Sequence, residues 1–162
     1  MSYSTLSNGS KVTSAVAAII EDAAGRVLLC RQAGGHQLWG LPGGKTRAEE
    51  SPVHAAIRDI REETGLETEI VELIGLYQLT GDGCGTTNPD LFVHVFRGRI
   101  DGDGGPALNA PGRISRLAWH DPDALPAPLT ATTRTAITDA AAGRTGVIRE
   151  VQRDAEPEVI DA

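Results

Sequence analysis

Runs of aliphatic residues alternate with turn-forming segments along the chain, and this pattern predicts strands interleaved with two helices. Residues 13–21 and 26–31 are rich in residues that favour strands, and the turn composition of residues 22–25 between them predicts a β-hairpin. Residues 34–44 form a glycine-rich loop. Three further strands are expected at residues 69–79, 91–100 and 114–119, and a second helix is expected at residues 130–142.

The best-defined element is a helix between Ser51 and Gly65. Ser51 is a suitable N-cap, and Pro52 occupies the first helical position, where its missing N–H costs nothing. Gly65 stands where a left-handed residue commonly ends a helix. The order of strands and helices indicates an α/β layered fold in a single domain.

The two ends of the chain are expected to lie outside the folded domain. We expect an N-terminal extension at residues 1–11, one folded domain at residues 12–145 and an acidic C-terminal tail at residues 146–162. Five acids and two bases lie in residues 149–162, which therefore resemble a solvated tail.

The composition of the chain excludes some classes of function. The 162-residue chain has a formal charge of −7, so it lacks the basic surface that drives non-specific binding to nucleic acid or anionic membranes. No partner of either kind is expected, and a polyanionic substrate would need help from a metal ion. Neither a membrane span nor a leader pattern is visible, so a cytoplasmic location is expected. Two cysteines, Cys30 and Cys84, cannot build a disulfide framework, and Cys30 fits a buried structural thiol.

The helix at residues 51–65 carries acids on one side. At about 100° per residue, Asp59, Glu62 and Glu63 share a face that is expected to be open, while an apolar stripe faces the core. The stripe comprises Val53, Ala56, Ile57 and Ile60. Like charges one turn apart near a helix C-terminus are unfavourable. A hard cation such as magnesium would reverse that cost, because it prefers a few carboxylates with water and phosphate. An ordinary solvated helix face is the alternative.

Residues 44–66 resemble the Nudix box. Gly44 is followed after five residues by Glu50, and after seven more by Arg-Asp-Ile-Arg-Glu-Glu-Thr-Gly-Leu at residues 58–66. The lead-in Trp-Gly-Leu-Pro-Gly-Gly at residues 39–44 and the segment Trp-His-Asp-Pro-Asp-Ala-Leu-Pro at residues 119–126 are also similar to Nudix domains. The resemblance covers roughly residues 12–142 and implies an α/β/α sandwich with a mixed β-sheet.

The resemblance also implies roles for individual residues. Glu62, Glu63 and the Gly43 carbonyl match metal ligands, Arg58 matches the arginine that orients the box acids, and Glu50 matches an outer acid of the metal network. Asp59 stands where the family usually has a glutamate that binds metal or activates water. The implied cofactor is Mg²⁺, with Mn²⁺ as a substitute.

A second departure from the family pattern concerns the segment before Trp119. Related sequences often carry an acid in the segment before Trp119, but here Arg113 and Arg116 stand there. An additional ligand or general base is therefore sought elsewhere, and Asp82 or Asp90 are candidates, with turn chemistry as their alternative.

The activity implied is hydrolysis of a diphosphate linkage in a nucleoside diphosphate bonded to a group X, such as ADP-ribose or a nucleotide sugar. A pyrophosphatase of oxidised or ordinary nucleoside triphosphates is the runner-up. Candidate substrate-binding residues are Arg31, His36, Gly44 and Tyr77, although Tyr77 also suits a core position. Many relatives form dimers, so the resemblance allows a homodimer.

A module that senses nucleotides without cleaving them belongs to another function class. Such a module is expected to lose the box acids, and this chain retains them apart from the shorter side chain at Asp59. The sequence therefore favours catalysis.

Overall fold

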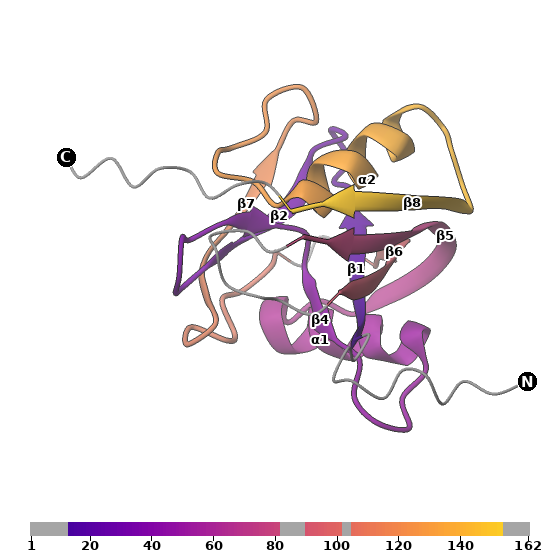
Figure 1. Ribbon diagram of the computed structural model, residues 1–162. Helices are drawn as coiled ribbons and strands as arrows, with labels where there is room; N and C mark the ends of the chain where they lie inside the picture. The colour runs from indigo at the N-terminus through magenta and orange to yellow at the C-terminus, as the bar shows by residue number, and fades with distance from the viewer. Residues whose placement is uncertain (1–12, 82–89, 102–104, 154–162) are drawn as a thin grey trace, which may run out of the picture.

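A computed structural model describes residues 13–81, 90–101 and 105–153 (Figure 1). Asp82, Cys84, residues 1–11 of the expected extension and the end of the expected tail lie outside these ranges. The elements are β1 (Thr13–Ile20), β2 (Val27–Gln32), β3 (Trp39–Gly40), β4 (Gly43–Lys45), α1 (Pro52–Thr64), β5 (Thr68–Thr80), β6 (Leu91–Ile100), β7 (Ile114–His120), α2 (Ala131–Ala141) and β8 (Val147–Gln152).

The strands form two sheets. The larger has the order β4-β1-β6-β5-β8 and is mixed, because β1 pairs with β6 and β5 pairs with β8 in parallel while the other neighbours are antiparallel. The smaller sheet, β3-β2-β7, is antiparallel. Helices α1 and α2 lie on opposite sides of the larger sheet (Figure 1), which confirms the expected α/β/α arrangement.

Strand β1 is buried on both faces, which explains its unbroken apolar run. Ala15, Ala17 and Ile19 pack in the cluster that includes α2 residues, whereas Val16, Ala18 and Ile20 pack in the clusters that include α1 residues. Successive strand side chains point to opposite faces, so a central strand covered by helices needs apolar residues at every position.

The expected hairpin at residues 13–31 is only partly correct. The turn forms as predicted, because the Asp22 carboxylate accepts backbone hydrogen bonds from Ala24 and Arg26 at 2.9 Å each. After the single bridge between Glu21 and Val27, however, β2 leaves β1 and pairs with β7 in the other sheet. Tertiary pairing thus overrides the local hairpin.

The expected tail begins too early at residue 146. Strand β8 pairs with β5 in parallel over six residues, and Val151 is buried in the core. Its alternation of half-buried and exposed side chains is typical of an edge strand, and the surrounding charges concealed this pattern in the sequence.

The two helices are close to their predicted bounds. In α2, Thr130 is the N-cap, and its side chain accepts a hydrogen bond from the Thr133 amide. Gly143 follows the helix in a left-handed conformation, as expected. Within the described ranges, neither helix has the length and apolar character needed to cross a membrane.

Candidate active site

Helix α1 holds the acidic residues of the box in place through well-formed ends. The Ser51 hydroxyl accepts a hydrogen bond from the His54 amide at 3.2 Å, and Pro52 begins the helix. Gly65 adopts φ 73° and donates its amide to Arg61 O at 2.9 Å. Both predicted caps are therefore confirmed, and they fix where the helix begins and ends.

The acidic face of α1 is less open than the sequence suggested. Asp59 and Glu63 are only 2% and 4% exposed, and Glu62 alone of the three is substantially accessible. The expected apolar stripe is shifted as well, because Val53 is exposed while Ala55 is buried. The reason is strand β4, whose glycines let its backbone lie against the acidic side of the helix.

The two glycines at the start of β4 are required by this close approach. A Cβ atom on Gly43 would stand 2.0 Å from the Val16 carbonyl oxygen, and one on Gly44 would stand 3.1 Å from Asp59 Oδ2. Glycine at both positions therefore lets β4 fit between β1 and the Asp59 side chain.

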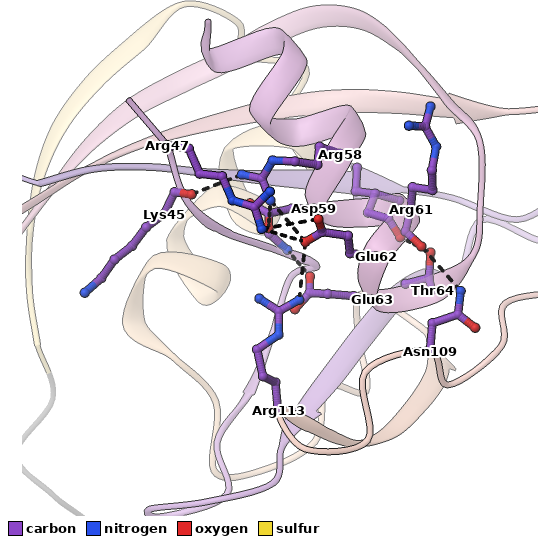
Figure 2. A network of polar contacts seen from close by, with 12 residues as sticks. Lys45, Arg47, Arg58, Asp59, Arg61, Glu62, Glu63, Thr64, Asn109 and Arg113 are labelled. Carbon is purple, nitrogen blue, oxygen red and sulfur yellow. Dashed lines mark hydrogen bonds and ion pairs between the residues drawn. The ribbon is translucent and has the colours of Figure 1, made fainter. Parts of the chain in front are cut away.

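Arg58 joins the acids into one network (Figure 2). Its Nε and Nη2 donate to the two Glu50 carboxylate oxygens at 2.6 and 2.8 Å, and its Nη1 donates to Asp59 and Glu62 at 3.1 Å each. These hydrogen bonds lower the pKa of Glu50 to about 2. Because both Glu50 oxygens are engaged by Arg58, Glu50 lies in a supporting position around the other acids.

Glu63 is a buried carboxyl group with one strong partner. Its Oε1 accepts a hydrogen bond from the Gly43 amide at 2.8 Å. Burial raises the pKa of Glu63 to about 7, although the Gly43 amide and the charge of Arg113 oppose the shift. Near neutral pH, this group therefore lies close to the point at which it gains or loses a proton.

Asp59 has an unsatisfied oxygen. Oδ1 accepts from Arg58, but the buried Oδ2 has no hydrogen-bond partner among the residues that the structure describes. Burial raises the pKa of Asp59, and the Arg58 charge opposes this shift. An unpaired carboxylate oxygen inside the protein is costly, so its presence beside other acids indicates a place for a cation or an ordered water.

The chemistry of these donors fits a divalent metal ion. They are hard carboxylate oxygens, and Asp59, whose buried Oδ2 is unpaired among the described residues, shares the Arg58 guanidinium with Glu62. Across the described ranges, no group of three or more His, Cys, Asp or Glu side chains is arranged to enclose a metal by itself. The site thus fits an ion such as magnesium, which takes one or two carboxylates and completes its shell with water and phosphate.

A cavity of about 1120 Å³ opens beside these acids. Its polar wall includes Glu63, Gly43 and His36, so three residues expected from the sequence line it. Much of the remaining wall is apolar and comes from Leu41, Leu79, Leu91, Val93, Leu125 and Leu129. Cys30 also lines the cavity and is buried as predicted, which raises the pKa of its thiol. The volume is sufficient for a nucleoside.

Three other candidate substrate residues lie elsewhere. Tyr77 is fully buried and donates its hydroxyl to Asp139 at 2.9 Å, so its predicted contact with substrate is wrong. Arg31 does not line the cavity, although its neighbours Cys30 and Gln32 do, because adjacent strand residues face opposite ways. Gly44 lies where an added Cβ would meet the Asp59 carboxylate, and it does not line the cavity.

Two arginines near Glu62 were not assigned to the site from sequence. Arg47 Nη2 lies 3.3 Å from Glu62 Oε1, and Arg113 Nη2 lies 3.9 Å from Glu62 Oε2 (Figure 2). The run of arginines before Trp119 was the available signal for Arg113, but its distance from the box along the chain concealed the contact.

Asp90, a candidate additional ligand, has another role. Its Oδ2 accepts from Gln78 Nε2 at 3.2 Å, and its carbonyl accepts from the Thr13 amide at 3.1 Å. These bonds join the starts of β1 and β6 to the end of β5. These hydrogen bonds support a structural role for Asp90 in place of metal binding.

Comparisons with known proteins agree with this geometry. A family model described as the NUDIX domain matches residues 11–140. An RNA pyrophosphohydrolase of Teredinibacter turnerae is 40% identical over 63 residues, covering 39% of this chain and 37% of that protein. A putative 8-oxo-dGTP diphosphatase of Bacillus subtilis is 36% identical over 91 residues, covering 55% of this chain and 54% of that protein. The chain thus spans about half or less of the length of these curated relatives.

A solved structure gives a longer match. The MutT NUDIX hydrolase from Burkholderia pseudomallei superposes with a TM-score of 0.71 at 30% identity, covering 80% of this chain and 98% of that one. The residues matched by the family model include the acidic helix and the strands that pack around it. The chain therefore belongs to the Nudix family.

Proposed function

We propose that this protein is a divalent-metal-dependent pyrophosphohydrolase that cleaves the diphosphate linkage of a nucleoside diphosphate bonded to a group X. One observation carries the proposal: the buried carboxyl group of Glu63 lines a nucleoside-sized cavity, and Asp59 and Glu62 lie on the same side of helix α1. The acids suit the phosphate end of a substrate through a metal ion, and the apolar wall suits a base and sugar.

The reaction is addition of water to one phosphorus atom with loss of the bridging oxygen to the other phosphate. A divalent ion, magnesium or manganese, supplies positive charge for the phosphate oxygens and lowers the pKa of water when bound. Glu62 and Glu63 would hold it, with the Gly43 carbonyl nearby and Asp59 as the third acid. A carboxylate that does not bind the ion would accept the proton of the attacking water.

Arg58 and Glu50 orient these groups. With its guanidinium held by Glu50, Arg58 keeps the Asp59 and Glu62 carboxylates in one position. Such pre-organisation means that little reorganisation is needed when charge develops in the transition state. Their role is positioning, because both Glu50 oxygens are bonded to Arg58 and the Arg58 guanidinium is bonded to carboxylates.

The nucleoside triphosphate alternative is supported by the name of the Bacillus subtilis relative, a putative 8-oxo-dGTP diphosphatase. Both substrate classes contain a nucleoside and a phosphoanhydride, so the same acids could serve either. A 5′-triphosphorylated RNA is a weaker candidate substrate, because the formal charge of −7 on this protein opposes the binding of a long polyanion.

The test is a substrate panel with Mg²⁺, Mn²⁺ or EDTA. It contains ADP-ribose, a nucleotide sugar, a dinucleoside polyphosphate, CTP, 8-oxo-dGTP and a short 5′-triphosphorylated RNA. We expect nucleoside monophosphate release from an X-linked diphosphate, lost in EDTA. Preferred pyrophosphate release from a triphosphate would support the alternative. Nucleotide binding without turnover of any member would instead indicate a sensing module.

A further inference from the structure

Arg113 is held at the edge of the cavity by its backbone. Its amide donates to Ala110 O at 2.9 Å, and its carbonyl accepts from the Ala33 amide at 2.8 Å. The next residue, Ile114, is buried and begins strand β7. The start of the Arg113 side chain is therefore well fixed, while its guanidinium reaches toward the acids of α1 (Figure 2).

Arg113 differs from the two other arginines beside Glu62, because it faces the cavity. Arg58 is 17% exposed and is committed to Glu50, Asp59 and Glu62. Arg47 contacts Glu62 but does not line the cavity. Arg113 lines it together with Glu63, is half exposed, and makes a long 3.9 Å ion pair with Glu62.

The position of Arg113 suits a negatively charged ligand. A guanidinium offers forked N–H donors that match phosphate oxygens. Because the ion pair of Arg113 with Glu62 is long, little interaction energy is lost when Arg113 binds a phosphate instead. A phosphate held by the acids through a cation would lie within the same corner of the cavity as Arg113. Its fixed positive charge also opposes a second cation at Glu62, because like charges at this separation repel.

We propose that Arg113 binds a phosphate group of the substrate at the metal centre and supplies, by its fixed charge, part of the stabilisation that an additional metal ion would provide. This inference rests on the proposed function, because it assumes a phosphate-containing substrate. It assigns Arg113 two measurable effects: tighter binding of the nucleotide and weaker binding of free divalent ions.

The first experiment measures nucleotide binding and steady-state kinetics for Arg113→Ala. We expect KM for the best substrate of the panel to rise about tenfold, with a smaller change in kcat, and Arg113→Lys to recover part of the loss because it restores the charge without the fork. Arg116→Ala, which removes an exposed arginine of β7, is the matched control and should leave KM within about twofold.

The second experiment titrates Mn²⁺ into nucleotide-free protein and follows the free ion by electron paramagnetic resonance. Arg113→Ala should bind Mn²⁺ about three- to tenfold more tightly than the wild type, because a nearby positive charge is removed. Arg47→Ala also removes a charge at Glu62 and should shift Mn²⁺ affinity in the same direction. This readout does not depend on turnover.

The outcomes separate this inference from the proposed function. If the wild type hydrolyses its substrate and Arg113→Ala keeps both KM and Mn²⁺ affinity, the role of Arg113 is refuted while the proposed function stands. If the wild type hydrolyses nothing in the panel, the affinity for a methylene-bridged nucleotide analogue replaces KM. Equal affinity of the wild type and Arg113→Ala for that analogue would again refute the role.

Discussion

The Gly43 amide donates a hydrogen bond to Glu63 Oε1 over 2.8 Å, so strand β4 directly orients a carboxyl group of helix α1. The same glycine lies in register with Ala17 of β1, at the edge of the mixed sheet. A change at either residue therefore affects both the packing of α1 and the geometry of the acids.

Glu62→Gln and Glu63→Gln test the site assignment. Each change removes the charge of a proposed metal ligand while keeping the shape of the side chain. In Glu63→Gln the new side-chain carbonyl can still accept a hydrogen bond from the Gly43 amide. We expect kcat to fall by about 100-fold or more with the fold retained. Steady-state assays and circular dichroism check this. Glu67→Gln, at an exposed partner of Arg61, is the control and should retain activity. Full activity in both site variants would refute the assignment.

The stability of the metal-free protein should depend on pH through Glu63. The folded pKa of about 7 lies above the usual 4.5, so the folded state keeps a proton that the unfolded state has lost between these values. The free energy of unfolding should therefore fall by about 3 kcal/mol as pH rises from about 4.5 to about 7.

Urea unfolding in EDTA across this pH range measures the effect. Glu63→Gln cannot ionise, so the difference between its curve and the wild-type curve isolates Glu63 from other groups. Saturating Mg²⁺ should reduce the pH dependence in the wild type, because a bound cation favours the charged carboxylate. An identical pH dependence in Glu63→Gln and the wild type would contradict the prediction.

Asp59→Glu restores the residue that the family usually has at this position, and we expect it to be harmful here. The Asp59 side chain is buried and its Oδ1 is held by Arg58, so a side chain longer by one methylene must displace this contact or shift strand β4. Overpacking should lower the free energy of unfolding by about 1–3 kcal/mol and reduce kcat/KM. Chemical denaturation and kinetics measure both, with the exposed Asp101→Glu as control. A rise in rate would show that the shorter acid is a handicap.

Gly43→Ala should disrupt the contact between β4 and β1. Its Cβ would stand 2.0 Å from Val16 O, which forces the backbone to move. We expect a loss of about 3 kcal/mol in unfolding free energy together with reduced turnover, because Glu63 loses its oriented partner. Thermal unfolding provides the measurement. Gly105→Ala meets no atom within 4 Å and should be nearly neutral; equal stability of the two variants would argue against this packing.

Tyr77→Phe distinguishes a core residue from a substrate-binding one. The hydroxyl donates to Asp139, which also accepts from Arg144 and Arg149 and has its pKa lowered to about 2, mainly by Arg149. Loss of one hydrogen bond should cost about 1 kcal/mol in unfolding free energy and leave KM within about twofold.

Asp139→Ala provides the comparison for Tyr77→Phe. It leaves the buried Tyr77 hydroxyl without its acceptor, while Arg144 and Arg149 remain accessible to water, and should cost about 1–3 kcal/mol in unfolding free energy. Urea titrations and substrate kinetics measure both variants. A large rise in KM for Tyr77→Phe at unchanged stability would restore its predicted contact with substrate.

Local signals predicted the elements that depend on local chemistry. Ser51, Pro52 and Gly65 bounded α1 correctly because capping involves neighbouring residues in the chain. Which strands pair with one another was harder to predict. Strand β2 pairs with β7 and not with β1, and β8 pairs with β5, from which it is far separated in the sequence. Which strands pair depends on side chains far apart in the sequence, so the turn at residues 22–25 did not determine it.

The sequence by itself determined the family, the acidic helix and its arginine, because the spacing of the box places these side chains within one or two turns of α1. Only the tertiary structure decided which of them are buried, that Tyr77 belongs to the core, and that Arg113 reaches Glu62. Burial and long-range contacts arise from the packing of β4 and β7 around the helix. They set the pKa of Glu63 and the charge of the cavity wall, which no local spacing encodes.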